Sequence, residues 1–252
     1  MLEPERGFVL SWHRHGNSLA GLAAVRAAAA RGPSALAGRP LAHGVELDLK
    51  WAGALLYAWH GPTGRERLSA ARARAWAGDD RLALVDDAYL ERARDLPLLV
   101  ELKAGVGPAD RALEALAALA ARHAARVWLA ASSLDLLALA RRVWPDAPRV
   151  LFASPAPEGR VWHRPTTSTA RSLLRRGLAP RLSPGEVDLL CPLGLRAASV
   201  EVHARRAEAA RARGLDYLPG RVTSREVLAA LAGDGRLPGA FVYAAAAAWP
   251  DL

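Results

Sequence analysis

The feature that most constrains the fold is a regular alternation of short apolar segments with Ala/Leu/Arg-rich helical stretches along the whole chain. Eight segments are predicted as strands, beginning at Phe8, Val45, Leu98, Val127, Arg149, Val187, Leu215 and Ala240. Strand–helix alternation of this kind is typical of a parallel sheet with helices outside. Eight units in 252 residues, without a linker or a break in composition, predict a single-domain α/β (β/α)8 TIM barrel over residues 1–252.

The helical stretches are bounded by turn and cap residues. The first follows a cap at Ser18 or Asn17 and ends near Ala30, where Gly32 and Pro33 stop it. Later helices are predicted over Asp110–Arg122, Leu134–Val143, Thr169–Arg176, Val200–Arg213 and Ser224–Leu231. The paired acids at residues 79–80 and 86–87 are predicted to serve turns and caps rather than a metal.

Two of the predicted strands carry charged residues on one face. Residues 45–50 and 99–103 both alternate apolar and charged side chains, so each strand separates the two kinds onto opposite faces. The charged residues are Glu46, Asp48 and Lys50 in the first strand, and Glu101 and Lys103 in the second. Carboxylate oxygens beside a cation suit a divalent metal that holds a phosphate. A pair of amphipathic strands with a solvated face is the alternative interpretation.

Two histidine segments stand close to these strands. His13 ends the first predicted strand, and His60 ends a further extended piece over residues 54–60. Because the active site of a (β/α) barrel lies at the C-terminal ends of its strands, we expect these histidines and the acids to converge at one rim.

Composition narrows the partners and the compartment. The net charge of +9 comes from scattered arginines with no basic run interleaved with aromatic residues, so a nucleic-acid partner is not predicted. Cys191 is the single cysteine, which excludes an intrachain disulfide framework. The first residues lack the layout of a secretory signal, and no apolar run approaches the roughly 20 residues of a membrane span. We expect a cytoplasmic protein without stable membrane insertion.

These residues resemble the motifs of the glycerophosphodiester phosphodiesterase family. That family shows His-Arg-Gly, Pro-Glu-Asn-Thr, Glu-x-Asp, His-Asp and Glu-x-Lys in this order along a TIM barrel. The corresponding segments here are His13-Arg14, His15-Gly16-Asn17-Ser18, Glu46-Leu47-Asp48, His60-Gly61 and Glu101-Leu102-Lys103.

The resemblance implies a phosphoric diester hydrolase that needs one divalent cation, Mg²⁺ or Ca²⁺, and acts on a small-molecule phosphodiester. The implied site residues are the metal ligands Glu46, Asp48 and Glu101, the acid–base pair His13 and His60, and the phosphate-contacting Arg14, Lys103 and Asn17. A histidine titrates near neutrality, so one can take a proton from the attacking oxygen while the other protonates the leaving group. The attacking oxygen is either water or a hydroxyl of the substrate that gives a cyclic phosphate.

Several positions depart from the family pattern. Gly16 replaces the Glu of Pro-Glu-Asn-Thr, Gly61 replaces the Asp after the second histidine, and His15 is an alternative to His13. The family's late motifs, which shape the pocket for the alcohol, are replaced around residues 132–133 and 220–223. The identity of the alcohol released from the substrate is therefore open. The alternatives are a phospholipase D-like or other specialised phosphodiester enzyme of the same superfamily, or a barrel that binds a phosphate ester without turnover.

The remaining histidines are interpreted mostly as packing or surface residues. His43, His123 and His203 fall in predicted loops or on helix faces. His163 follows the fifth predicted strand and could contact a headgroup or a second phosphate.

Overall fold

The structure is a computed structural model, and it describes residues 7–62, 66–102, 109–131, 134–153, 200–212, 214–219, 222 and 225–242. The strands are β1 Phe8–Trp12, β2 Ala35–Leu36, β3 Arg39–Ala52, β4 Leu55–Ala58, β5 Ala83–Leu84, β6 Leu98–Leu102, β7 Val127–Ala131, β8 Arg149–Ala153, β9 Asp216–Pro219 and β10 Gly239–Val242. The helices are the 3-10 turn η2 His15–Asn17, then α1 Leu19–Arg31, α2 Ala70–Gly78, α3 Asp87–Ala93, α4 Ala109–Arg122, α5 Leu134–Val143, α8 Val200–Arg211 and α9 Arg225–Gly233. The predicted strand at 187–191, the predicted helix at 169–176, His163 and Cys191 lie outside the described residues.

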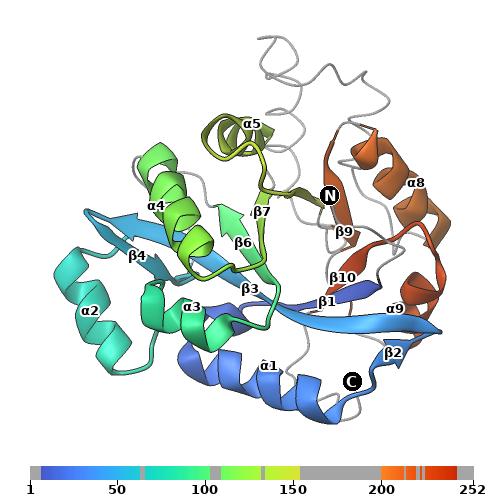
Figure 1. Cartoon of the computed structure of the whole chain (residues 1–252), viewed down its shortest axis with the longest axis horizontal. Coiled ribbons are helices and arrows are strands. Elements are labelled where there is room, and N and C mark those ends of the chain that lie inside the picture. Colours follow the sequence, from blue (N-terminus) through green and yellow to red (C-terminus); the bar gives the residue numbers. More distant parts are fainter. Residues whose placement is uncertain are drawn as a thin grey trace.

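Seven strands form one parallel sheet in the order β10-β1-β3-β6-β7-β8-β9. Helices lie around the outside of these strands (Figure 1). Seven of the eight predicted strands are therefore confirmed, and β8 pairs directly with β9. Within the described ranges, no helix is both long enough and apolar enough to cross a bilayer.

The second strand is longer than predicted. We expected it to begin at Val45, but β3 begins at Arg39 and spans 14 residues. Its first half pairs with β1, Phe8 opposite Leu41, and also with the short antiparallel β2. Pairing with β2 at residues 39–40 and with β1 at residues 41–45 makes a strand of a stretch whose Pro40 and Gly44 carry no strand signal by themselves.

The sheet curls around a common interior. One inner cluster of apolar side chains draws on both ends of the strand order and on its middle: Val9, Leu99, Trp128, Ala130, Val150, Leu218 and Phe241. Val222, just beyond β9, also forms a parallel bridge to Val242 in β10. A flat sheet would hold its two edges far apart, so these contacts require barrel-like curvature.

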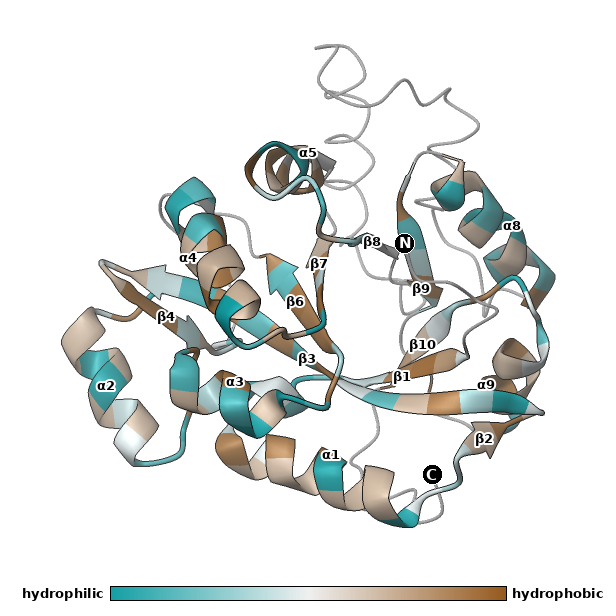
Figure 2. Cartoon of the chain, in the orientation of Figure 1, coloured by the Kyte–Doolittle hydropathy of each residue, from teal (hydrophilic) through white to brown (hydrophobic). Residues whose placement is uncertain are grey.

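The other face of the strands packs against the helices. Leu10, Leu47 and Val100 are fully buried with inward-facing helix residues such as Leu22 and Leu116. Each fully buried side chain of this size contributes about 1.5–3 kcal/mol relative to exposure. Alternate β3 residues face this layer and the interior, and Figure 2 shows the alternation as brown and teal bands along β3.

Two of the residues predicted to cap helices do so in the structure. The Ser18 hydroxyl accepts a hydrogen bond from Gly21 N at 3.0 Å, which confirms Ser18 as the cap of α1. The Asp86 carboxylate accepts from Tyr89 N at 2.9 Å and caps α3, as predicted for this pair of acids. Capping by Ser or Asp is worth about 0.5–2 kcal/mol for each helix.

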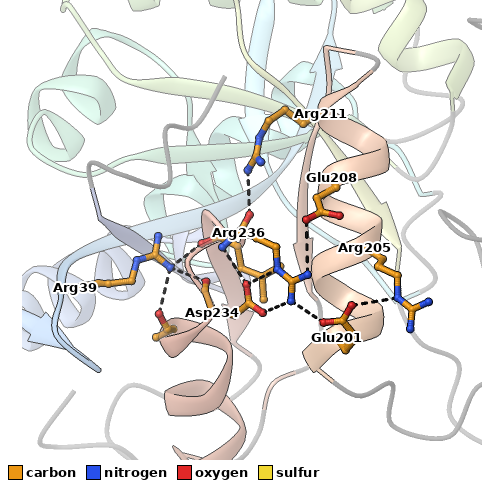
Figure 3. A network of polar contacts seen from close by, with 9 residues as sticks. Arg39, Glu201, Arg205, Glu208, Arg211, Asp234 and Arg236 are labelled. Atoms are coloured by element: carbon orange, nitrogen blue, oxygen red, sulfur yellow. Dashed lines mark hydrogen bonds and ion pairs between the residues drawn. The ribbon is translucent and has the colours of Figure 1, made fainter.

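A network of arginines ties the N-terminal end of the barrel together (Figure 3). The Arg39 guanidinium donates to Gly7 O at 2.8 Å and to three carbonyls at the end of α9 and after it, those of Ala232, Asp234 and Leu237. Arg236 binds Asp234 and, at 2.7 Å, Glu201 of α8, and its hydrogen bonds lower the pKa of both carboxyls. This network therefore joins β1, β3, α8 and the α9–β10 connection at the end of the strands away from their carboxyl termini.

Candidate metal and phosphodiester site

Three carboxylates meet at the C-terminal ends of two neighbouring strands. Asp48 of β3 stands directly opposite Glu101 of β6, and Glu46 lies two residues earlier on the same face of β3. One carboxylate oxygen from each residue lies within 4.8 Å of the other two. The Glu46 and Asp48 side chains are fully buried, so their mutual repulsion is little screened by water. An all-oxygen set of this size fits a hard divalent cation.

The turn after β1 is hydrogen-bonded to two of these acids. Arg14 adopts a left-handed conformation with φ 60°, and its backbone N–H donates to Glu46 Oε2 at 2.7 Å. Asn17 exchanges two hydrogen bonds with Asp48, Nδ2 to Oδ2 at 2.6 Å and Asp48 N to Asn17 Oδ1 at 2.8 Å. The half-exposed Arg14 guanidinium lies 3.9 Å from Asp48 Oδ2. The carboxylates and the turn therefore form one connected unit.

His13 and His15 leave this turn in different directions. The His13 ring packs edge-on against Phe241, 5.3 Å between centroids, and Phe241 belongs to the inner cluster. The His15 ring lies 5.8 Å from that of Trp12, which belongs to the outer, helix-facing layer. The interior of the barrel is therefore on the His13 side.

His60 reaches the rim by a hairpin. The extended piece predicted over 54–60 is the antiparallel strand β4, which pairs with the end of β3, Ala58 opposite Leu49. The N–H of Trp59 then donates to Asp48 O at 2.9 Å, so the chain returns to the level of the acids just before His60. His60 Nδ1 lies 2.5 Å from Gly61 O. Because a carbonyl only accepts, Nδ1 carries the proton in the neutral ring and Nε2 the lone pair.

Comparison with known proteins identifies solved structures of similar fold. Neither a family model nor a curated protein matches the chain. Solved structures do match: a glycerophosphodiester phosphodiesterase from Agrobacterium tumefaciens str. C58 is 19% identical with a TM-score of 0.50, over 94% of this chain and 96% of that one. One from Parabacteroides distasonis ATCC 8503 is 14% identical with a TM-score of 0.52, over 94% and 93%. A protein from Silicibacter pomeroyi DSS-3, assigned as a glycerophosphoryl diester phosphodiesterase, is 18% identical with a TM-score of 0.57, over 96% and 93%.

The chain has the fold of these phosphodiesterases. The similarity runs through nearly the full length of each protein. It confirms the expected barrel class, which is the fold that the motif resemblance implies. At 14–19% identity, it is the fold that is shared.

Two departures from the phosphodiesterase motifs have steric causes. A Cβ on Gly16 would stand 2.7 Å from Glu46 O and 2.8 Å from Leu47 Cβ, so no larger residue fits between this turn and β3. Gly61 has φ +72°, and a Cβ there would stand 2.5 Å from Glu66 Oε2 and 3.0 Å from the Trp59 ring. The packing against the β3 backbone therefore requires glycine at position 16, whereas at position 61 it is the left-handed backbone that favours glycine, since the Glu66 carboxylate ends a flexible side chain.

Two residues of this site, Tyr89 and Lys50, had no specific role predicted from the sequence. Tyr89 of α3 is buried and donates from its hydroxyl to Gly16 O at 2.8 Å, and burial together with the nearby Glu46 charge raises the pKa of that hydroxyl. Lys50 is fully buried, and its ammonium donates to His60 O and Glu66 O. The period-2 pattern of β3 places Lys50 on the face of the acids; no local pattern points to Tyr89. Lys103 lies outside the described residues.

The other described histidines serve packing or surface contacts, as predicted. His43 is in β3 rather than in a loop, accepts from Trp12 Nε1 at 3.2 Å, and has its pKa lowered by burial. His203 of α8 contacts the Tyr217 hydroxyl at 2.7 Å. His123 lies 2.9 Å from the Asp87 carboxylate, between the end of α4 and α3.

Proposed function

We propose that this protein is a metal-dependent phosphoric diester hydrolase that cleaves glycerophosphodiester-type substrates to an alcohol and a phosphomonoester. The observation that carries the proposal is the triad of carboxylates within 4.8 Å, with a histidine on each of the two segments hydrogen-bonded to it. His13 precedes Arg14, whose N–H binds Glu46, and His60 follows Trp59, whose N–H binds Asp48 O. The similar structures named as phosphodiesterases support the same activity.

The proposed cation site consists of Glu46, Asp48 and Glu101. A bound Mg²⁺ or Ca²⁺ supplies Lewis-acid polarisation of a phosphate oxygen and offsets the charge of the acids. The fit rests on the chain itself, because two fully buried carboxylates and a third on the adjacent strand are costly to hold together without a cation.

The histidines are the proposed acid–base pair. His60, with its proton on Nδ1, presents Nε2 as a base in the neutral ring, and His13 stands on the interior side of the turn, which favours it over His15. One takes a proton from the attacking oxygen and the other gives one to the leaving alkoxide. Arg14 offers a planar fork to phosphate oxygens, and Lys103 is proposed as a second phosphate contact. Asn17 was predicted to contact the phosphate; its two hydrogen bonds to Asp48 favour a role in holding that carboxylate.

A second candidate keeps the reaction and changes the substrate. The Trp59 ring and the Glu66 carboxylate crowd the position beside Gly61. The replacement of the family's Asp by Gly61 favours a specialised phosphodiester enzyme, of phospholipase D-like or related preference, over an enzyme for simple glycerophosphodiesters. In either case we propose that residues 1–252 act as one domain, on a small molecule, in the cytoplasm.

The test is hydrolysis of bis(p-nitrophenyl) phosphate, glycerophosphocholine and a panel of lysolipid diesters, with and without a chelator. We expect turnover that chelation abolishes and added Mg²⁺ or Ca²⁺ restores, and a loss of at least about 100-fold in His60→Ala. His123→Ala, which changes a histidine away from the acids, is the matched control and is expected to keep full activity.

The products separate the remaining alternatives. Phosphorus NMR of the glycerophosphocholine or lysolipid reaction distinguishes a cyclic phosphate from an open phosphomonoester, and thus attack by a substrate hydroxyl from attack by water. No turnover of any diester together with saturable binding of a phosphate ester would overturn the enzymatic proposal in favour of a binding barrel.

A further inference from the structure

Lys50 is a buried cation whose contacts are directed at the segment that carries His60. Its side chain is fully buried, and its Nζ donates to Glu66 O at 2.6 Å and to His60 O at 3.1 Å. The ammonium also lies 4.8 Å from the centre of the Trp59 ring. One side chain from β3 therefore contacts Trp59, His60 and Glu66.

These contacts join the histidine to the acids through a single strand. Lys50 lies two residues after Asp48 on the same face of β3, and the Asp48 carbonyl accepts the N–H of Trp59. His60 thus lies between two anchors on β3, one through the backbone of Trp59 and one through its own carbonyl. A displacement of about 1 Å in a reacting group can cost about 100-fold in rate, so such anchoring has kinetic consequences.

Stability alone gives little reason for a cation here. Taking an ammonium out of water costs several kcal/mol, and replacing a buried charge by an apolar side chain of similar volume is often neutral or stabilising. The cation–π contact and the two carbonyls offset part of that cost. A methionine at this position would have a similar volume and would remove the charge, the two hydrogen bonds to the carbonyls and the cation–π contact.

We propose that Lys50 is a positioning residue that fixes His60 relative to the carboxylates by holding the carbonyls of His60 and Glu66. The proposal rests on the proposed phosphodiesterase function and adds to it a residue that acts through the backbone of the segment carrying His60. It accounts for a lysine on a strand face whose other charged members are acids.

The experiment is a double-mutant cycle with Lys50→Met and His60→Ala, using bis(p-nitrophenyl) phosphate and glycerophosphocholine. We expect Lys50→Met to lower kcat by about 10- to 100-fold with little change in KM, and the double variant to be no slower than His60→Ala alone. Arg149→Met is the matched control, since Arg149 also donates to backbone carbonyls, at the opposite end of the strands; it is expected to leave kcat unchanged.

A second measurement judges the anchoring without turnover. Amide hydrogen exchange of the peptide covering residues 56–62 is expected to accelerate at least about 10-fold in Lys50→Met, while the melting temperature and the apparent Kd for Mg²⁺ or Ca²⁺ stay near those of the wild type. Additive losses in the cycle, a loss of cation binding in Lys50→Met, or unchanged exchange at 56–62 would overturn the proposal. If the wild type turned over no diester, the proposed function would fail, and the exchange result would decide the anchoring by itself.

Discussion

Asn17 and Asp48 bind each other through both polar atoms of the asparagine amide, at 2.6 and 2.8 Å. The first bond orients the Asp48 carboxylate, and the second uses the Asp48 backbone N–H, which faces the same side chain. An amide that accepts from a strand backbone and donates to the carboxylate on that strand fixes the carboxylate relative to the sheet. The turn after β1 is therefore part of the support of the proposed cation site.

Asn17→Ala is expected to weaken cation binding. Loss of a partner that orients a metal ligand typically costs about 10- to 100-fold in metal affinity. The measurement is the concentration of Mg²⁺ or Ca²⁺ that gives half-maximal activity or half-maximal thermal stabilisation. Ser18→Ala, next in the chain, removes only the cap of α1; it should cost about 1 kcal/mol of stability and leave cation affinity unchanged. Equal cation affinity in wild type and Asn17→Ala would contradict this prediction.

Cation binding itself should raise stability. A cation that binds among Glu46, Asp48 and Glu101 binds only the folded chain, so at 100 times its Kd it stabilises the folded state by about 2.7 kcal/mol. The check is the melting temperature as a function of added Mg²⁺ or Ca²⁺ after treatment with a chelator. In Asp48→Asn the shift should largely disappear, whereas Asp87→Asn, which changes an exposed acid on α3, should keep it. A shift of full size in Asp48→Asn would place the cation elsewhere.

Gly16→Ala should destabilise the fold. The added methyl group would stand within 2.7–3.0 Å of Glu46 O, Leu47 Cβ and the Tyr89 hydroxyl, and forcing a methyl group into packed surroundings typically costs about 1–3 kcal/mol. Urea unfolding measures the loss. Gly78→Ala is the control, because a Cβ there meets nothing within 4 Å; it is expected to be neutral or slightly stabilising. Equal unfolding free energies for the two variants would show that the turn can move away from β3.

The buried histidine of α8 makes stability depend on pH. Burial, and secondarily the charge of Arg206, lowers the pKa of His203 from 6.5 to about 4. Between these values the unfolded chain binds the proton and the folded one does not, so stability falls as the pH drops from about 6.5 towards 4. We expect the wild type to lose about 1–3 kcal/mol more than His203→Gln between pH 7.5 and 4.5, in urea unfolding. Parallel pH profiles for the two proteins would rule out this effect of His203.

The acids of the site were predictable because their signal is local. The period of two in β3 and β6 fixes which side chains share a face, and the parallel pairing then brings Asp48 opposite Glu101. The eight-unit rhythm similarly predicts the order of the sheet along the described chain. Arg39–Gly44 gave no such signal, since this half of β3 is specified by its neighbours β1 and β2 rather than by its own alternation.

What the sequence could not show depends on contacts between distant segments. Tyr89 reaches Gly16 across 73 positions of the chain, and no pattern around residue 89 anticipates the contact. His60 was expected at the rim as the end of one more strand; it arrives there because β4 runs back along β3. Glycine at 61 is favoured by a left-handed φ of +72°, a backbone conformation that the surrounding sequence did not signal.

The unbroken run of β3 has a consequence for how this chain can change. Arg39 secures one end of the strand, and Lys50 lies near the other, with the inward acids between them. Removing or adding a single residue between Arg39 and Glu46 would turn every later side chain by half a period and face the acids towards the helices. The length of this stretch is therefore fixed, and homologous sequences should align across it without gaps.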